Sequence, residues 1–261
     1  MKIVVPVKSV AVLDDEPEIV GGVAVDPDAL DRDLNEWDAF SLEEALLLRE
    51  AAGEGEVVVV TVGDADADEA LLACLAKGAD RGLRVWDDAL EGADALAVAY
   101  VLAAAVEREA PDLVLCGVQS SDAVNGATGV ALAGYLDLPR AAVVAGIEHD
   151  AASGAVTVRR ELEGGLVELV RVGLPALLTV QTGGNEPRYA NLRALKQARE
   201  KPREQRSLAE LGLDAGAVAA TTGSRVRALA VPERGAGAEM LGGSADDVAR
   251  RIVEIVGERV S

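Results

Sequence analysis

Aromatic residues, cysteine and histidine are all scarce in this chain. Phe, Trp and Tyr make up 2% of its 261 residues, while half of the residues are hydrophobic, so a core must be built mostly from Ala, Val and Leu. Cys74 and Cys116 both stand in apolar segments, which suits buried thiols in a reducing cytoplasm better than a disulfide or a metal site. We therefore expect a cytoplasmic location and no bound metal.

Long apolar runs and positive charge are lacking as well. No run can span a bilayer, and Pro6 and Lys8 interrupt the N-terminal apolar stretch, which argues against a signal peptide. With 25 Lys and Arg against 45 Asp and Glu, the formal net charge is −20, so general binding to nucleic acid is not expected. The carboxylates are spread along the whole chain. They fit either a surface adapted to a salt-rich cytoplasm or a genome that favours acidic residues, Arg and Ala.

Continuous apolar runs alternate with helical patterns in the first 145 residues. Strands that are apolar throughout are buried on both faces, which is typical of a parallel sheet covered by helices on each side. The sequence therefore predicts a doubly wound, mainly parallel α/β fold with its ligand at the carboxyl ends of the strands. Asn35, or Ser41 with Glu44, is expected to cap the first helix. The predicted strands are 2–7, 56–62, 83–86 and 112–116, with a hairpin at 19–25, and the predicted helices are 35–52, 67–77 and 93–109.

The pattern changes after Gly146. We divide the chain into an α/β domain over residues 1–200 and a C-terminal arm over residues 201–261, which is expected to pack on a partner subunit or on the core. The later elements expected are a hairpin at 155–161 and 166–172, a strand at 177–180, a basic helix after Pro187, a polar connection at 200–224, a strand at 225–231 and a helix at 244–259 with Val248, Ile252, Ile255 and Val256 on one face.

A loop rich in small residues, 117–129, follows the fourth predicted strand and leads into a helix. Free backbone N–H groups and the helix dipole at such a place can bind an anion, and the loop also carries serine, threonine and asparagine donors. Its glycines match neither G-x-G-x-x-G nor G-x-x-x-x-G-K-[ST], and no lysine stands within it. The loop is therefore either a nucleotide site or a glycine-rich turn, and Asp122 within it favours a ligand with one phosphate.

Candidates for catalysis are few. His149 is the only histidine and is expected in a turn, no serine stands in G-x-S-x-G, and neither cysteine has basic neighbours that would activate it. Any chemistry in which this protein takes part is therefore expected to be carried by a bound group.

Residues 188–206 are basic in an otherwise acidic chain, with seven Lys or Arg among them. Leu192, Leu195, Lys196 and Arg199 are spaced so that they share one face of a helix. That face either docks a partner, with Pro187 stiffening its entry, or the leucines turn toward the core and the basic residues form a solvated face.

Several segments resemble the electron-transfer flavoprotein beta subunit along essentially the whole chain. They include Glu161-Leu162-Glu163-Gly164-Gly165-Leu166 and, as the most specific of them, Asn185-Glu186-Pro187-Arg188-Tyr189-Ala190-Asn191-Leu192. The resemblance implies an adenine-nucleotide-binding α/β fold and a heterodimer with a larger alpha subunit. That subunit would hold most of one redox-active FAD.

The resemblance also implies a structural AMP in the small subunit, or a second FAD in its place where the protein bifurcates electrons. The residues that would contact this nucleotide are Pro6, Asn35, Glu36, Trp37, Asp38, Val62, Gly117, Val118, Gln119, Ser120, Ser121, Asp122, Ala123, Val124, Asn125, Gly126, Ala127 and Thr128.

The family presents a docking loop to its electron donors, with a leucine as its anchor. By position that leucine is Leu192. A glutamate, here Glu161, would pair with an arginine of the alpha subunit; the alternative is an ordinary hairpin carboxylate beside Arg159 and Arg160. The residues expected to dock partners are Glu161, Pro187, Arg188, Tyr189, Leu192, Lys196 and Arg199.

The function implied is electron transfer without bond-making chemistry in this subunit. Electrons would pass from flavin dehydrogenases, such as those of fatty acid oxidation that act on acyl-CoA, toward a membrane quinone oxidoreductase. Two alternatives are an ATP- or AMP-binding module like the universal stress proteins and an ATP-using enzyme of similar fold. The first would use a late glycine-rich phosphate loop and the second an S-G-G-x-D-S loop, and the sequence has neither.

Overall fold

The computed structural model describes residues 1–12, 18–26, 30–150, 153–231, 237–238 and 240–260. Its centre is a nine-stranded sheet in the order β11-β10-β9-β12-β8-β1-β6-β7-β13. The strands from β9 to β13 in that order are parallel, and β10 is antiparallel to both β9 and β11. The predicted doubly wound, mainly parallel fold is confirmed. The strands are β1 (Lys2–Pro6), β6 (Glu56–Val62), β7 (Arg81–Val85), β8 (Leu113–Gly117), β9 (Arg140–Asp150), β10 (Ala155–Glu161), β11 (Val167–Gly173), β12 (Ala176–Val180) and β13 (Arg203–Arg206).

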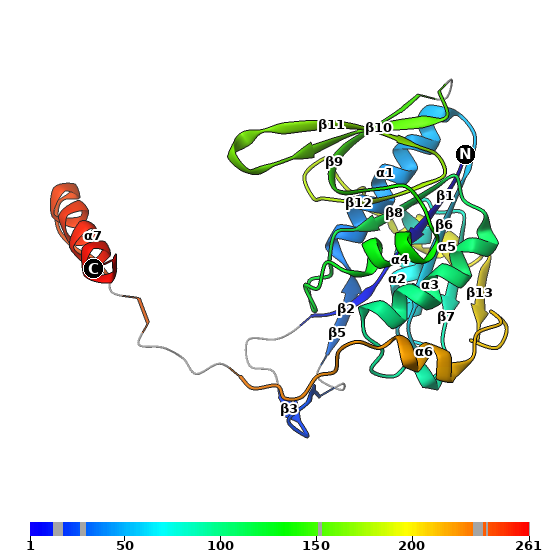
Figure 1. Cartoon of the computed structure of the whole chain (residues 1–261), viewed down its shortest axis with the longest axis horizontal. Helices are drawn as coiled ribbons and strands as arrows, with labels where there is room; N and C mark the ends of the chain where they lie inside the picture. The colour runs from blue at the N-terminus through cyan, green and yellow to red at the C-terminus, as the bar shows by residue number, and fades with distance from the viewer. Residues whose placement is uncertain (13–17, 27–29, 151–152, 232–236, 239, 261) are drawn as a thin grey trace.

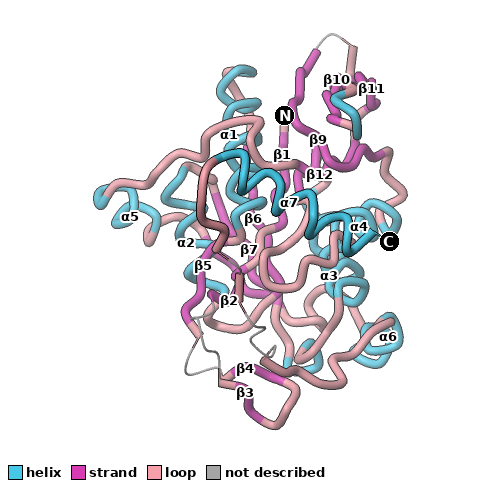
Figure 2. Tube along the Cα trace, turned by 90° about the vertical axis from the view of Figure 1, so that its left-hand side faces the viewer, coloured by secondary structure: helices cyan, strands magenta, loops and turns pink. Residues whose placement is uncertain are grey.

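Helices cover both faces of this sheet, as Figure 2 shows edge-on. Along each central strand, successive side chains point to opposite faces of the sheet. Val57 and Val59 of β6 pack in the hydrophobic cluster beneath α1 and α2, whereas Val58 and Val60 belong to the cluster beneath α3 and α4. Both faces are therefore apolar, which explains why the central strands have unbroken hydrophobic sequences. The helices are α1 (Glu36–Ala52), α2 (Ala67–Lys77) and α5 (Leu192–Ala198) on one face and α3 (Ala95–Glu109), α4 (Thr128–Tyr135) and α6 (Ala215–Thr221) on the other.

Two hairpins confirm expectations from the sequence. β10 and β11 pair antiparallel and extend from the upper end of the body in Figure 1. β3 (Ile19–Val20) and β4 (Ala24–Val25) pair around Gly21 and Gly22, which both have positive φ angles that favour glycine. A further short pair joins β2 (Ser9–Val12) to β5 (Asp31–Leu34).

Four local predictions are wrong. Residues 203–206, expected in a polar connection, form β13 and extend the sheet beside β7. Residues 225–231 form no strand. His149 lies within β9, opposite Val156, and not in a turn. Ser41 lies inside α1, where its hydroxyl donates to the Trp37 carbonyl oxygen, so it caps nothing.

The C-terminal helix α7 (Ala245–Val260) stands apart from the body in Figure 1. It does not pack on the core of this chain. Ile252 and Val256, on the apolar face that the spacing predicts, are 49% and 54% exposed. A surface helix with such a face normally buries it against another element, so α7 has an apolar face that the described part of the chain leaves open.

Among the described residues, no helix combines the length and the apolar content that crossing a membrane requires.

Candidate functional site

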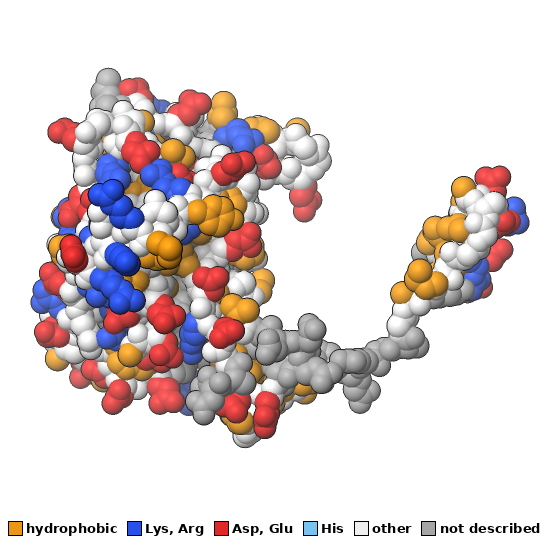
Figure 3. All heavy atoms as spheres, turned by 180° about the vertical axis from the view of Figure 1, so that it is seen from behind, with side chains coloured by type: hydrophobic (Ala, Val, Ile, Leu, Met, Phe, Trp, Pro, Cys, Tyr) orange, Lys and Arg blue, Asp and Glu red, His pale blue; other side chains and the backbone are white. Residues whose placement is uncertain are grey.

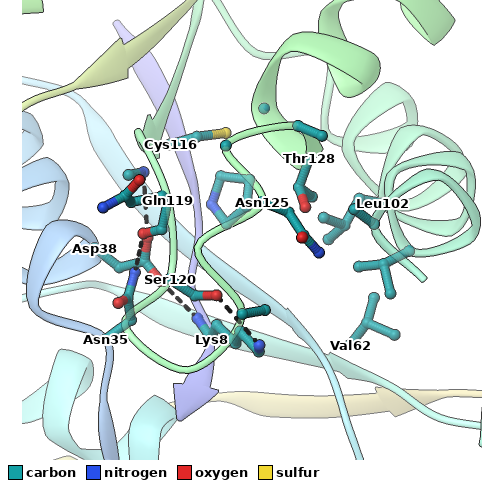
Figure 4. Close-up of a pocket in the computed structure, with 18 of the residues that line it drawn as sticks. Lys8, Asn35, Asp38, Val62, Leu102, Cys116, Gln119, Ser120, Asn125 and Thr128 are labelled. Carbon is teal, nitrogen blue, oxygen red and sulfur yellow. Dashed lines mark hydrogen bonds between the residues drawn. The ribbon is translucent and has the colours of Figure 1, made fainter. Parts of the chain in front are cut away.

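A cavity of about 220 Å³ lies at the carboxyl ends of β1 and β8. These two strands are neighbours, but the chain leaves β1 toward β6 on one side and returns to β8 on the other. This is the point where the strand order reverses, and open α/β sheets bind their ligands there because the loops diverge and leave a crevice. Figure 4 shows the cavity between the loop after β8 and α3, which carries Leu102.

Most of the residues expected to bind a nucleotide come together around this cavity. We call residues 117–129 the cavity loop. The predicted residues that line the cavity are Pro6, Asn35, Asp38, Val62, Gly117, Val118, Gln119, Ser120, Ala123, Asn125, Gly126, Ala127 and Thr128.

Five predicted residues do not line it. Glu36, Ser121 and Val124 are exposed, and Asp122 lies on the outer part of the cavity loop. Trp37 points elsewhere, because its indole N–H donates to Gln181 Oε1 at 2.9 Å.

Asn35 fixes the shape of the cavity loop. Its Nδ2 donates to the carbonyl oxygen of Gln119 at 2.8 Å, and its Oδ1 accepts from the backbone N–H of Ser121 at 3.2 Å. Its own backbone N–H donates to the Lys8 carbonyl oxygen at 3.0 Å. Asn35 precedes α1, but its side chain does not cap that helix. It joins the loop after β8 to the loop after β1, so its buried amide is a structural part of the site.

Asp38, on α1, also links the carboxyl ends of β1 and β8. Its carboxylate accepts from the backbone N–H of Lys8 at 2.8 Å and of Gly117 at 3.2 Å. Burial raises the pKa of Asp38 to about 7, although those hydrogen bonds act in the opposite direction. A Cβ on Gly117 would lie 2.4 Å from Asp38 Oδ1 and 2.7 Å from Trp37 Cβ, so only glycine lets β8 approach α1 this closely.

Part of the lining was not predicted from the sequence. Lys8 follows β1, and Figure 4 places it beside Ser120, at the end of the cavity where Asn35 and Asp38 also lie. The position of Lys8 could have been predicted, because a residue just past the first strand of such a fold lies at the carboxyl ends of the strands, where these folds bind ligands. Other residues missed are Val7, Cys116 and Gly129, together with Ala93, Asp94, Ala95, Val98 and Leu102 around the start of α3.

Two helix N-termini meet at the cavity, and they differ. At α3, Asp94 Oδ1 accepts from the backbone N–H groups of Leu96 and Ala97, both at 3.0 Å, so a carboxylate of the protein already satisfies these donors. No side chain caps α4, whose first residue is Thr128. Two backbone donors at the start of α3 are therefore already satisfied, whereas the start of α4 offers donors that no side chain of the protein caps.

The cavity is apolar on one side and polar on the other. Figure 4 shows Asn125 and Thr128 of the cavity loop facing Val62 and Leu102. The apolar side suits an aromatic base or a sugar edge, and the polar side suits a phosphate.

A second candidate site is the corner at residues 185–191, which leads into α5. Arg188 Nη2 donates to Glu43 Oε1 at 2.8 Å, and Arg188 Nη1 donates to Glu50 Oε1 at 2.7 Å. Asn185 Nδ2 donates to the Phe40 carbonyl oxygen at 3.1 Å and to Glu44 Oε2 at 3.0 Å. The corner is thus fastened to α1 along its length. Arg188, expected to dock a partner, has its guanidinium group engaged within this chain.

The other residues of the corner and helix face outward. Tyr189 is 99% exposed and Leu192 80%, and Leu195 is 41% exposed. Lys196 and Arg199 are exposed as well, while Pro187 is half-buried. Ala198 is the buried contact of α5 with the core. In the rear view of Figure 3, basic and hydrophobic side chains gather on the half of the body where α5 lies.

Glu161 lies at the end of β10 and is exposed. Its Oε1 accepts from Arg159 Nη1 at 2.7 Å, and both side chains are largely open to solvent. An exposed pair of this kind contributes little to stability, so Glu161 can exchange Arg159 for another cation at little cost.

Within the described part of the chain, no three His, Cys, Asp or Glu side chains form a group that could hold a metal ion. Both cysteines are free and buried, and burial raises the pKa of each thiol above its usual range.

Comparison with known proteins agrees with this architecture. The electron transfer flavoprotein domain family matches residues 23–211. The chain is 49% identical over 261 residues to the electron transfer flavoprotein subunit beta of Methylophilus methylotrophus, covering 99% of this chain and 98% of the relative. The subunit beta of Bradyrhizobium diazoefficiens is 37% identical, covering 82% and 84%, and that of Bos taurus is 36% identical, covering 72% and 73%. The chain therefore belongs to the electron transfer flavoprotein family, among its beta subunits.

Proposed function

We propose that this beta subunit pairs with a larger alpha subunit and carries electrons from flavin dehydrogenases, such as acyl-CoA dehydrogenases of fatty acid oxidation, toward a membrane quinone oxidoreductase. The redox chemistry belongs to one FAD, held mainly by the alpha subunit. This chain performs no bond-making chemistry of its own. It stabilises the complex, forms one side of the flavin environment and presents a docking surface, in the cytoplasm.

The cavity would hold a structural AMP. Val62, Val98 and Leu102 offer an apolar wall for the base, and the cavity loop offers the hydroxyl of Thr128 and the amide of Asn125. The uncapped N-terminus of α4 supplies backbone donors for one phosphate. A second FAD in place of AMP remains the alternative ligand for a protein that bifurcates electrons.

The exposed corner and α5 would form the surface that docks dehydrogenases. Leu192 is 80% exposed on a helix whose entry is fastened to α1, so little entropy is lost when it inserts into a partner's pocket. Tyr189, Lys196 and Arg199 would surround this anchor, with Arg188 holding the corner in place.

Within the predicted C-terminal arm, residues 201–261, β13 and α6 pack in the body of this chain, and the part beyond them would serve the alpha subunit. Its helix α7 has an apolar face that this chain does not cover, and Figure 1 shows it standing apart from the body. Glu161 at the end of β10 would pair with an arginine of the alpha subunit and restrain the flavin-bearing part of the complex.

The observation that carries this proposal is the cavity at the strand-order reversal, because the residues that the family resemblance implies gather there. Co-expression with the alpha subunit encoded in the same genome tests it. A yellow heterodimer that contains FAD and is reduced by an acyl-CoA dehydrogenase with its substrate is expected. A colourless homodimer that binds ATP would support the alternative, a module of the universal-stress-protein type.

A further inference from the structure

Lys8 is the one Lys or Arg among the described residues that line the cavity. Its ammonium group already has partners. Lys8 Nζ lies 2.6 Å from Asp122 Oδ1 and 3.3 Å from Ser120 Oγ. The Lys8 side chain is 45% exposed and that of Asp122 is 24% exposed, so the pair stands at the rim of the cavity, open to solvent on one side.

The charge of Lys8 is therefore neutralised before any ligand arrives. Burial alone would raise the pKa of Asp122, but hydrogen bonds from Lys8 and Ser120 outweigh burial and hold that pKa below its usual range, so Asp122 is ionised at neutral pH. Asp94, which also lines the cavity, adds a further carboxylate at the start of α3. The described lining thus offers no unpaired cation to a ligand.

A first phosphate does not need Lys8, because the N-terminus of α4 supplies neutral backbone donors. A second phosphate is different. It would add negative charge near Asp122 and Asp94, and sites that bind di- and triphosphates meet that charge with a cation such as the lysine of the P-loop.

We propose that Asp122 sets the number of phosphates that the cavity accepts, by occupying Lys8. The pair makes the site selective for a nucleoside monophosphate and against a pyrophosphate, whether that pyrophosphate belongs to ADP, ATP or a dinucleotide such as FAD. This inference rests on the proposed function, in which the cavity holds an adenine nucleotide, and it assigns the choice of ligand to one ion pair.

Asp122 is one of several residues that hold the loop, since its carboxylate also bonds to Ser120 and to the backbone N–H of Ala123. Asn35 fixes the backbone at Gln119 and Ser121 from below, and the Val124 N–H donates to the Ser120 carbonyl oxygen at 2.9 Å. The amide side chain of Asp122→Asn keeps an oxygen that can accept the bonds from Ser120 and Ala123, so a change in ligand preference in this variant would report on charge.

The test uses the purified complex of the full-length chain with its alpha subunit, freed of nucleotide by dialysis. Each variant is equilibrated with equal concentrations of AMP and ADP, and the bound nucleotides are measured by mass after denaturation. The variants are Asp122→Asn, the double variant Asp122→Asn with Lys8→Gln, and Asp137→Asn. The last removes the same charge from an exposed position just past α4.

In Asp122→Asn, Lys8 is released, so the ratio of ADP to AMP bound is expected to rise about tenfold, as a gained charge-assisted hydrogen bond implies. The double variant lacks the released cation and should return to the wild-type ratio. Asp137→Asn should not change it.

An unchanged ratio in Asp122→Asn, or an equal rise in the double variant, would overturn the inference while leaving AMP as the ligand. Loss of AMP binding in Asp122→Asn alone would assign Asp122 to holding the loop and would also overturn it. Failure of the wild-type complex to bind either nucleotide would remove the proposed nucleotide site itself.

Discussion

Arg188 and Glu43 join the corner at residues 185–191 to the helix that also borders the cavity. Arg188 Nη2 donates to Glu43 Oε1 at 2.8 Å, and the Arg188 backbone N–H donates to Glu43 Oε2 at 3.0 Å. Glu43 is a buried carboxylate on α1, and Asn35, just before α1, holds the cavity loop. One helix therefore positions both candidate sites. The pair fixes the direction in which the corner points, while Tyr189 and Leu192 remain exposed.

Replacing Arg188 with Gln should destabilise the protein, because it leaves the buried Glu43 carboxylate without its cation. We expect a loss of about 1–3 kcal/mol, at the lower end because a third of the Arg188 side chain is exposed. Urea denaturation of the purified complex at fixed protein concentration measures the change. Arg193→Gln, at an exposed position on α5, is the matched control and should have little effect.

The loss of stability in Arg188→Gln should depend on pH. Burial alone would raise the pKa of Glu43, but the hydrogen bonds from Arg188 outweigh it and hold that pKa below the usual value of 4.5. The stabilisation is therefore present in full above pH 4.5 and is lost as the pH falls through the lower folded-state pKa. The stability difference between wild type and Arg188→Gln should be constant from pH 6 to 8 and shrink in acid. A difference that is unchanged in acid would show that the ion pair is not its source.

Leu192→Ala should weaken docking of a flavin dehydrogenase more than Lys196→Ala does in high salt. An apolar anchor in a pocket typically contributes ~2 kcal/mol or more, whereas at 1 M salt the Debye length is about 3 Å and rim charges contribute little. Dissociation constants for an acyl-CoA dehydrogenase, measured at 1 M salt, compare the two. The fold should not change, because Leu192 is 80% exposed. A larger effect of Lys196→Ala in these conditions would contradict the assignment of Leu192 as the anchor.

Glu161→Ala should change the rate of electron transfer between the complex and its dehydrogenase, because the carboxylate is proposed to restrain the flavin-bearing part of the alpha subunit. Stability should hardly change, since the Glu161–Arg159 pair is exposed. Glu163→Ala removes an exposed carboxylate from the turn of the same hairpin and serves as the control. Stopped-flow rates equal to wild type in Glu161→Ala would remove the proposed role.

Gly117→Ala should destabilise the protein by about 1–3 kcal/mol, because the added Cβ would overlap Asp38 and the backbone-proximal part of Trp37. It should also weaken nucleotide binding, since Gly117 lines the cavity. Gly134→Ala is the control: its Cβ meets nothing within 4 Å and it lies within α4, where alanine is the better helix former. The Tm of Gly117→Ala should fall and that of Gly134→Ala should rise. An equal change in Tm in the two variants would contradict the close approach at Gly117.

The central strands and helices could be predicted from the sequence because their pattern is set by burial on both faces. Four consecutive valines, Val57–Val60, form the centre of β6 (Glu56–Val62), and the strand begins and ends at the predicted residues. The edge strand β13 has the sequence Arg-Glu-Gln-Arg and was not predicted. An edge strand pairs with one neighbour and buries little apolar surface, so its sequence shows no hydrophobic pattern that would predict it. Residues 225–231 have the composition of a strand, but within the described part of the chain they join no sheet, although the Leu229 N–H donates to the Gly22 carbonyl oxygen at 2.7 Å.

The cavity was predicted in part for a similar reason. The loop after β8 could be recognised because its residues are contiguous and small. Lys8 follows β1 and Asp94 precedes α3, and only the order of strands in the sheet brings them to the same place. Asn35 was expected near the nucleotide, but its bonds to Gln119 and Ser121 depend on the path of the loop, which periodicity does not determine.

The mass of the nucleotide released when the purified heterodimer is denatured tests the account most directly. We predict FAD and AMP in equal amounts, one of each per complex, with the AMP from the cavity beside Lys8 and Thr128. Two FAD per complex and no AMP, or a cavity that releases ADP or ATP, would contradict both the assigned ligand and the role given to the Lys8–Asp122 pair.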